Sequence, residues 1–371
     1  MKKMPLIYPH DLVAYLFNTL GVSISQEAVT RYWLHQLNTE QPFAVHGPGD
    51  TNCVPLGLYG DGARLATLYK HEKLIAIWLN LPLYRPRSTR SSRWLLFSIM
   101  ADQLHSHWTM DAVLRHMLWS FWALFKGEIP QRGPFGRELP PNLAGREGEQ
   151  IVHRRKLQFI ITEYRGDWEW HRDLWHFVQC SWKSERVCWM CDARRCADWQ
   201  SAYWNLEENS TWANNPFTKA QFLAERQPER GLCPLVLAPG FHPSAIRWCS
   251  MHVLNLGLFY RSNGASLILL ANDLAFFGDE GSFQDRLDRA YEHFQNFAKE
   301  RKIPNSQPRF RERHVIKGDN EVCWTHKAFN GRVLLVWLTW CLENAWIRFP
   351  DKRDKRFALT YHAQTLCLQQ L

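Results

Sequence analysis

The sequence PLGLYGDGARL at residues 55–65 contains an apolar run that leads to an aspartate between two glycines. Such a run predicts a β-strand that carries Asp61 at its end. Gly60 and Gly62 let the backbone turn sharply there and let a metal ion or phosphate approach closely. Apolar runs at residues 73–83 and 93–104 predict the next two strands of the same sheet. Asp61 is therefore a candidate metal-binding carboxylate.

A second aspartate follows a fourth predicted strand. Residues 110–126 have the apolar period of an amphipathic helix, and residues 157–164 (LQFIITEY) form an apolar run that leads to Asp167 beside Gly166. The order strand, strand, strand, helix, strand is the one in which a ribonuclease H-like sheet brings two aspartates together. Two close carboxylates are costly unless a divalent cation neutralises them, so the pair predicts Mg²⁺ or Mn²⁺. The alternative is that both are ordinary turn aspartates.

A group of cysteines and histidines lies directly downstream. Cys188 and Cys191 have the C-x-x-C spacing that lets two thiolates share one Zn²⁺ from a tight knuckle. We expect a structural zinc site that takes its other ligands from nearby residues, and the candidates are Cys180, Cys196, His171 and His176. The alternatives are buried free thiols and a redox dithiol.

The charge of the chain favours an anionic partner. The formal net charge is +9, and nucleic acid is the commonest anionic partner of a basic protein. The cluster within one Pro/Ser-rich loop between two predicted strands is Arg85, Arg87, Arg90 and Arg93, and we assign these side chains to nucleic-acid binding. Further clusters are Arg309, Arg311 and Arg313, and Arg348, Lys352, Arg353, Lys355 and Arg356. The alternative is a surface that is merely basic.

The compartment is predicted from what the sequence lacks. Prolines and charges interrupt any signal-peptide core near the N-terminus, and the longest apolar run, residues 333–342, is far below the roughly 20 residues of a spanning helix. The 10 cysteines are too few for a disulfide scaffold. We expect a nuclear or cytoplasmic protein that is not secreted and has no membrane partner.

The 371 residues are predicted to fold as an α/β protein with four segments. Residues 1–50 form an N-terminal helical segment, and residues 51–200 form a ribonuclease H-like core with the cysteine-rich knuckle. Residues 201–310 form a mostly helical insertion, and residues 311–371 complete the core with helices and a basic tail. The predicted fold is thus a ribonuclease H-like mixed sheet flanked by helices, with a zinc-knuckle insertion and extra helical segments.

Three features in this order resemble the transposases of cut-and-paste DNA elements, of the kind that use two aspartates and a third acid, in the families related to the CACTA and hAT groups. They are the Gly-Asp-Gly strand end at Asp61, the Gly-Asp turn at Asp167 with Cys188 and Cys191 after it, and the Met-His-x-x-x-Leu-Gly segment that begins at Met251. The likeness covers roughly residues 55–270. It includes a departure, because members often carry an acid just before Met-His, where this chain has Cys249 and Ser250.

The resemblance implies a metal-dependent enzyme that cleaves and transfers DNA strands at a two-metal carboxylate site. It makes Asp61 and Asp167 the first two catalytic acids, and Glu343 on a C-terminal helix our choice for the third, with Glu321 second. A decayed or domesticated copy that binds DNA without catalysis is one alternative. A zinc-stabilised module that contacts other proteins is another. Each of these leaves room for a homo-oligomer.

Overall fold

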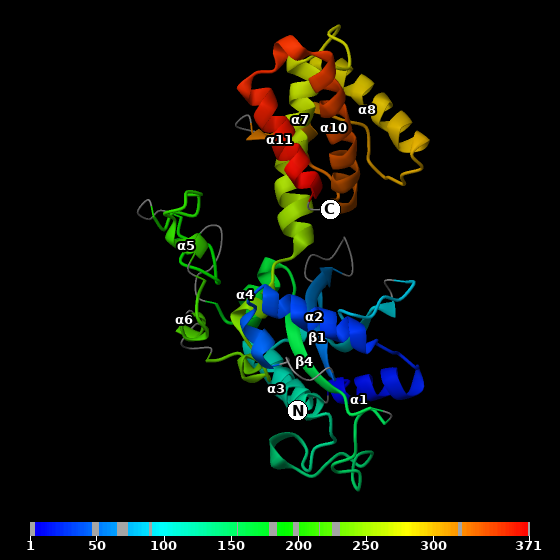
Figure 1. Cartoon of the computed structure of the whole chain (residues 1–371), viewed down its shortest axis with the longest axis vertical. Helices are drawn as coiled ribbons and strands as arrows, with labels where there is room; N and C mark the ends of the chain where they lie inside the picture. The colour runs from blue at the N-terminus through cyan, green and yellow to red at the C-terminus, as the bar shows by residue number, and fades with distance from the viewer. Residues whose placement is uncertain are drawn as a thin grey trace. The chain divides into compact units, whose positions relative to one another are not determined.

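The computed structural model describes residues 4–46, 52–64, 73–88, 91–153, 155–177, 184–195, 200–214, 216–224, 231–317 and 321–369. The chain divides into two compact units, residues 1–248 and 249–371 (Figure 1). The first unit holds the five-stranded sheet, and the second is mostly helical. Each unit is described by itself.

Short helices precede the sheet. α1 (Pro9–Ala14) continues into the π-helical turn η1 (Tyr15–Thr19), and α2 (Gln26–Asn38) begins where the Ser25 side chain accepts a hydrogen bond from the Ala28 amide. The indole of Trp33 in α2 donates a 2.7 Å hydrogen bond to the Cys53 carbonyl at the start of the sheet. The turn η2 (Pro42–His46) follows α2. The hydrogen bond from Trp33 thus ties α2 to the start of β1.

The sheet contains the four predicted strands and one short addition. β1 (Cys53–Arg64), β2 (Lys73–Asn80) and β3 (Arg93–Met100) are antiparallel neighbours, and β4 (Gln158–Arg165) pairs with β1 in parallel. β5 (Ile246–Arg247) then pairs with β4 in parallel. The order across the sheet is β3-β2-β1-β4-β5. The prediction of a mixed α/β fold with flanking helices is confirmed.

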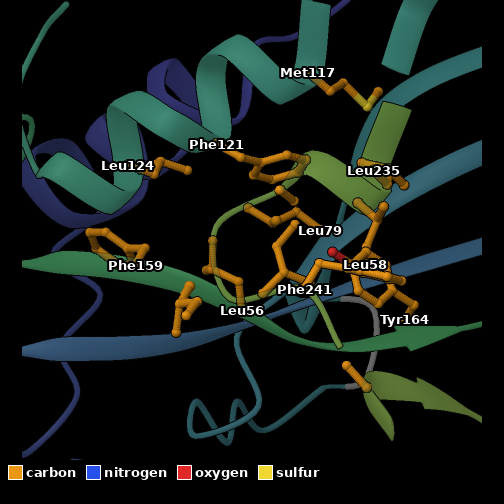
Figure 2. Packing of buried hydrophobic residues seen from close by; sticks show 14 of the residues in the cluster. Leu56, Leu58, Leu79, Met117, Phe121, Leu124, Phe159, Tyr164, Leu235 and Phe241 are labelled. Carbon is orange, nitrogen blue, oxygen red and sulfur yellow. The ribbon is translucent and has the colours of Figure 1, made fainter. Parts of the chain in front are cut away.

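The helix α3 (Ser106–Lys126) covers one face of the sheet. Figure 2 shows Met117, Phe121 and Leu124 of α3 on the side of the core that faces Leu56 of β1 and Phe159 of β4, and all five side chains are buried. Full burial of an aliphatic or aromatic side chain contributes about 1.5–3 kcal/mol, so the contact of α3 with the sheet stabilises the first unit. Gly127, with a φ of 74°, ends α3 in the left-handed conformation that favours glycine.

Short elements connect the strands of the first unit. η4 (Ala101–Gln103) precedes α3, η5 (Pro134–Gly136) lies in the loop after it, and α4 (Trp168–Leu174) follows β4. α5 (Thr211–Asn214), α6 (Lys219–Ala224), η7 (Pro234–Leu237) and η8 (Pro243–Ala245) lead to β5. The segment between α3 and β4 contains an isolated antiparallel bridge, Glu128 to Gln150.

Long helices form most of the described part of the second unit. η9 (Met251–Leu258), α7 (Phe259–Ile268) and η10 (Leu269–Asp273) run on as one helical stretch, followed by α8 (Phe283–Glu300), α10 (Ala328–Arg348) and α11 (Lys355–Gln369). The smaller elements are α9 (Glu312–Val315), β6 (Ile316–Lys317), β7 (Glu321–Val322) and η12 (Pro350–Lys352). α7, α10 and α11 pack side by side (Figure 1). A capping box of Ser282 and Asp285 starts α8.

No helix within the described ranges is both long enough and apolar enough to cross a bilayer.

Candidate functional site

The two predicted catalytic aspartates come from neighbouring strands at one edge of the sheet. In the parallel pairing of β1 with β4, Tyr59 lies opposite Arg165. Asp61 comes two residues after Tyr59, and Asp167 comes two residues after Arg165. The fold therefore brings the backbones of Asp61 and Asp167 to the same edge, although they are far apart in the sequence.

Asp61 lies inside β1 and not at its end. The strand continues through Arg64, and Asp61 is paired with Ala76 of β2. Its carboxylate is held locally, because Oδ2 accepts a 2.8 Å hydrogen bond from the Tyr59 hydroxyl and Oδ1 accepts a 2.7 Å bond from the Gly62 amide. The sharp turn predicted at this point is absent because both glycines adopt extended backbone angles within the strand.

Gly60 and Gly62 serve a different purpose from the one predicted. A Cβ on Gly60 would collide with the indole of Trp170 from α4, and so would a Cβ on Gly166. A Cβ on Gly62 would meet the flexible end of Lys73. Gly60 and Gly166 thus make room for the indole of Trp170 beside β1 and β4.

Strand alternation assigns Asp61 to one face of β1. Successive side chains of a strand point to opposite faces, so Asp61 lies on the face away from Gly60 and Gly62. On that face, Tyr59 contacts Trp78 of β2, and the Arg93 guanidinium lies 4.4 Å from the Tyr59 ring centre. Asp61 therefore belongs to a surface of aromatic and basic side chains.

The same face holds a buried carboxylate that the sequence analysis missed. Glu163 of β4 accepts a 2.9 Å hydrogen bond from Asn80 and a 2.7 Å bond from Arg165. Gly57 makes room for this network, because a Cβ there would meet both Asn80 and Glu163. An acidic residue inside an apolar strand is the signal that could have identified it.

Asp167 lies on the other face, at the wall of a cavity of about 370 Å³. Its Oδ1 accepts a 2.7 Å hydrogen bond from the Trp170 amide and caps α4. The cavity combines acidic and apolar groups, and Asp61 is not among the described residues that line it. The lining residues are Gly62, Lys73, Ile75, Ala101, Leu104, Met110, Asp111, Asp167, Glu169, Trp170, Asp173, Leu174 and His176.

A buried histidine and aspartate meet in the wall of this cavity. His176 Nε2 lies 3.2 Å from Oδ1 of Asp111 in α3, and its Nδ1 lies 3.2 Å from the Gly231 carbonyl oxygen. The backbone of His176 has a φ of 56°, in the left-handed region that is uncommon for residues other than glycine. In the sequence, His176 groups with the cysteines and Asp111 does not stand out, because no local pattern links two residues this far apart.

The predicted zinc knuckle is described only in part. Cys180 and Cys196 lie outside the described residues. Cys188 and Cys191 are not joined in a disulfide and line a cavity of about 400 Å³. A hydrogen bond with Cys188 lowers the pKa of the Cys191 thiol to about 7, although burial opposes the shift. No group of three or more His, Cys, Asp or Glu side chains within the described ranges is arranged to hold a metal ion.

His171, the other histidine candidate, is engaged elsewhere. Its Nε2 lies 3.1 Å from the Arg247 carbonyl oxygen of β5, and its Nδ1 accepts a 3.3 Å hydrogen bond from the Trp175 indole. Nε2 must therefore donate, which fixes the neutral ring. Burial lowers the pKa of His171 to about 4, against a weaker opposing effect of the bond to Arg247.

The candidates for the third acid both lie in the second unit. Glu343 is an exposed residue of α10, and Glu321 of β7 forms an ion pair with Arg261 of α7. Since each unit stands by itself, neither glutamate is placed relative to Asp61 or Asp167. The assignment of a third acid stays a prediction.

The predicted nucleic-acid arginines lie before and at the start of β3. Arg85, Arg87 and Arg93 are exposed, while Arg90 lies outside the described residues. In the second unit, some basic side chains already form intramolecular pairs. Arg309, for example, makes two hydrogen bonds to Asp288.

Comparison with known proteins gives no relative to argue from. The sequence matches no protein-family model, and no curated protein matches it significantly. The function must therefore be argued from the geometry of the sheet edge.

Proposed function

We propose that the chain is a transposase-like protein that cleaves and transfers DNA strands with divalent cations held at the edge of a ribonuclease H-like sheet. The observation that carries the proposal is the register of β1 and β4. Asp61 and Asp167 each follow the directly paired residues Tyr59 and Arg165 by two positions. The strand order β3-β2-β1-β4-β5 supports it, since that order makes β1 and β4 parallel neighbours.

The donor groups fit divalent cations. Mg²⁺ prefers carboxylate oxygens and is usually held by one or two of them, with waters and substrate phosphates completing its shell. Two aspartates on opposite faces of one edge can each hold a cation in this way, without a group of three protein ligands. Asp61 keeps lone pairs for a cation although both of its oxygens accept hydrogen bonds.

The residues around the carboxylates prepare them for this task. The Tyr59 hydroxyl and the Gly62 amide fix the orientation of the Asp61 carboxylate, and the Trp170 amide fixes that of Asp167. Bound cations would neutralise the phosphate and activate the attacking oxygen. The exposed Arg85 and Arg87 would bind the DNA backbone close to the sheet.

Nicking of supercoiled DNA tests the proposal. The full chain should nick plasmid DNA in Mg²⁺ or Mn²⁺, and Asp61→Asn and Asp167→Asn should each reduce the rate at least about 100-fold, as expected for the loss of a group that stabilises transition-state charge. Asp279→Asn changes an exposed aspartate of the second unit and should leave the rate unchanged. Equal nicking by all three variants would refute the assignment of the site.

A second candidate, DNA binding without catalysis, is favoured by the facing of the aspartates. Asp61 and Asp167 point to opposite faces, which disfavours a single shared cation site. In this case the wild-type chain would not nick DNA but would bind it, and affinity would fall steeply with salt. Arg85→Ala combined with Arg87→Ala should then reduce the salt dependence. A salt-insensitive contact with DNA would count against both candidates and favour a module that contacts proteins.

A further inference from the structure

The Asp111 and His176 side chains form a buried polar pair that the proposed function does not use. Asp111 is 3% exposed and His176 is 1% exposed, and their Oδ1 and Nε2 atoms lie 3.2 Å apart. A carboxylate this deeply buried is costly unless a positive charge compensates it. Despite the short distance, Oδ1 of Asp111 accepts no hydrogen bond from the described residues.

The protonation of the His176 ring follows from its other contact. Nδ1 faces the carbonyl oxygen of Gly231, which can only accept, so Nδ1 carries the proton. In the neutral ring Nε2 is then an acceptor, and it faces a carboxylate oxygen. Two atoms that present lone pairs to each other at 3.2 Å repel unless a cation binds both. That cation is either a second proton on the ring or a metal ion. Because Oδ1 of Asp111 accepts no hydrogen bond from the described residues, the proton is the less favoured of the two.

The distances match the geometry of metal ligands. Zn²⁺ and similar ions bind histidine nitrogen and carboxylate oxygen at about 2.0–2.2 Å, which places two adjacent ligands roughly 3.0–3.5 Å apart. Metal-binding histidines usually donate their other ring N–H to a backbone carbonyl or a carboxylate, as His176 does to Gly231. The backbone of His176, with a φ of 56°, is strained in the way that is common at functional sites.

The surrounding cavity gives a cation access and further oxygen donors. Glu169 and Asp173 are more than half exposed, and each already has a basic partner, Lys73 at 3.2 Å and Arg172 at 2.9 Å. Within the described residues, His176 is the one basic side chain that pairs with Asp111. The uncompensated negative charge is therefore deepest in the cavity, where water can complete the coordination shell of an ion.

We propose that Asp111 and His176 bind one first-row transition-metal cation, of the Mn²⁺ or Zn²⁺ class, in the cavity between α3 and the segment after α4. A nitrogen donor beside a carboxylate favours such ions over Ca²⁺ and Mg²⁺. The site is separate from the C-x-x-C pair and from Asp61. A cation there would tie α3 to the turn after α4. Asp167 caps the start of α4, and Trp170 lies within it.

Titration with Mn²⁺ alone tests the proposal. The full chain carrying Asp61→Asn and Asp167→Asn, which remove both cation ligands of the proposed function, is stripped with a chelator, and free Mn²⁺ is then followed by electron paramagnetic resonance. One Mn²⁺ should bind per chain. Asp111→Asn and His176→Asn should each weaken it at least about tenfold, as the loss of a metal-site group does. Asparagine suits position 176 because it tolerates a positive φ.

The controls separate this site from the other two. Cys188→Ser should leave Mn²⁺ binding unchanged, because Mn²⁺ prefers oxygen and nitrogen donors. His10→Asn, at another buried histidine of the first unit, should also leave it unchanged. Circular dichroism identifies a variant that fails to fold, and Asp111→Asn preserves the shape of the side chain. Lack of Mn²⁺ binding by the parent chain, or equal affinity in Asp111→Asn, would overturn the proposal. Nicking activity does not enter this test.

Discussion

The edge shared by β1 and β4 has two faces of different character. On one face, Asp61 is half-buried and held by Tyr59, and the nearby Glu163 is matched by Asn80 and Arg165. On the other face, Asp111 is buried against His176 inside a cavity. The first face is a set of carboxylates that protein groups already satisfy, whereas the second needs an additional cation. Burial and pairing, more than the presence of an acid, therefore distinguish a structural carboxylate from a candidate ligand.

Alanine substitutions on the two faces should differ most in stability. With the proposed cation bound, Asp111→Ala leaves the ion and His176 without their carboxylate in a buried site and should lower the free energy of unfolding by about 3–5 kcal/mol. Asp61→Ala removes two hydrogen bonds at a half-exposed position and should cost about 1–2 kcal/mol. Urea unfolding of both variants in saturating Mn²⁺ measures the difference. Similar losses would mean that the two faces are not distinct in energy.

The sequence predicted the strands because their signals are local. The apolar runs that became β1, β2, β3 and β4 each stand out within a few residues, and α3 is visible from its apolar period. The same runs also predicted that Asp61 and Asp167 approach one edge. What the sequence did not reveal is the face, because alternation within residues 55–64 does not say which side α4 will cover.

The pair of Asp111 and His176 lay beyond sequence reasoning for a related reason. It depends on three segments meeting: α3, the turn after α4 and the loop at Gly231. Proximity in sequence suggested instead that His176 belongs with the cysteines. The structure gives it a buried carboxylate and a carbonyl as partners, and nothing in the local sequence encodes those contacts.

The indole of Trp170 offers a sharper test of how the edge is built. Gly60→Ala places a Cβ against this ring and should cost about 1–3 kcal/mol, the usual range for overpacking. In a Trp170→Ala background the same change should cost less, since the obstruction is gone. Gly62→Ala is the matched control. Its Cβ meets only the flexible end of Lys73 and should have a smaller effect. Thermal or urea unfolding of the four variants gives the coupling, and additive losses would contradict the packing described for Trp170.

The thiols of Cys188 and Cys191 extend the comparison to a third set of candidate ligands, with an effect on reactivity and little on stability. Because its pKa is about 7, Cys191 should be largely thiolate above pH 7 and should lose reactivity toward iodoacetamide as the pH falls below that value. Burial raises the pKa of Cys233, so its thiol should stay unmodified over the same range. Mass spectrometry after short alkylation at several pH values measures both. Cys188→Ala removes the hydrogen bond that lowers the pKa of Cys191 and should shift its reactivity to higher pH.

If the pair binds Zn²⁺ as the sequence predicts, added Zn²⁺ should protect Cys191 from alkylation in the wild-type chain but not in Cys188→Ala. Equal alkylation with and without Zn²⁺ would instead identify the pair as free thiols, which would leave Asp111 and His176 as the stronger candidate for a transition-metal site.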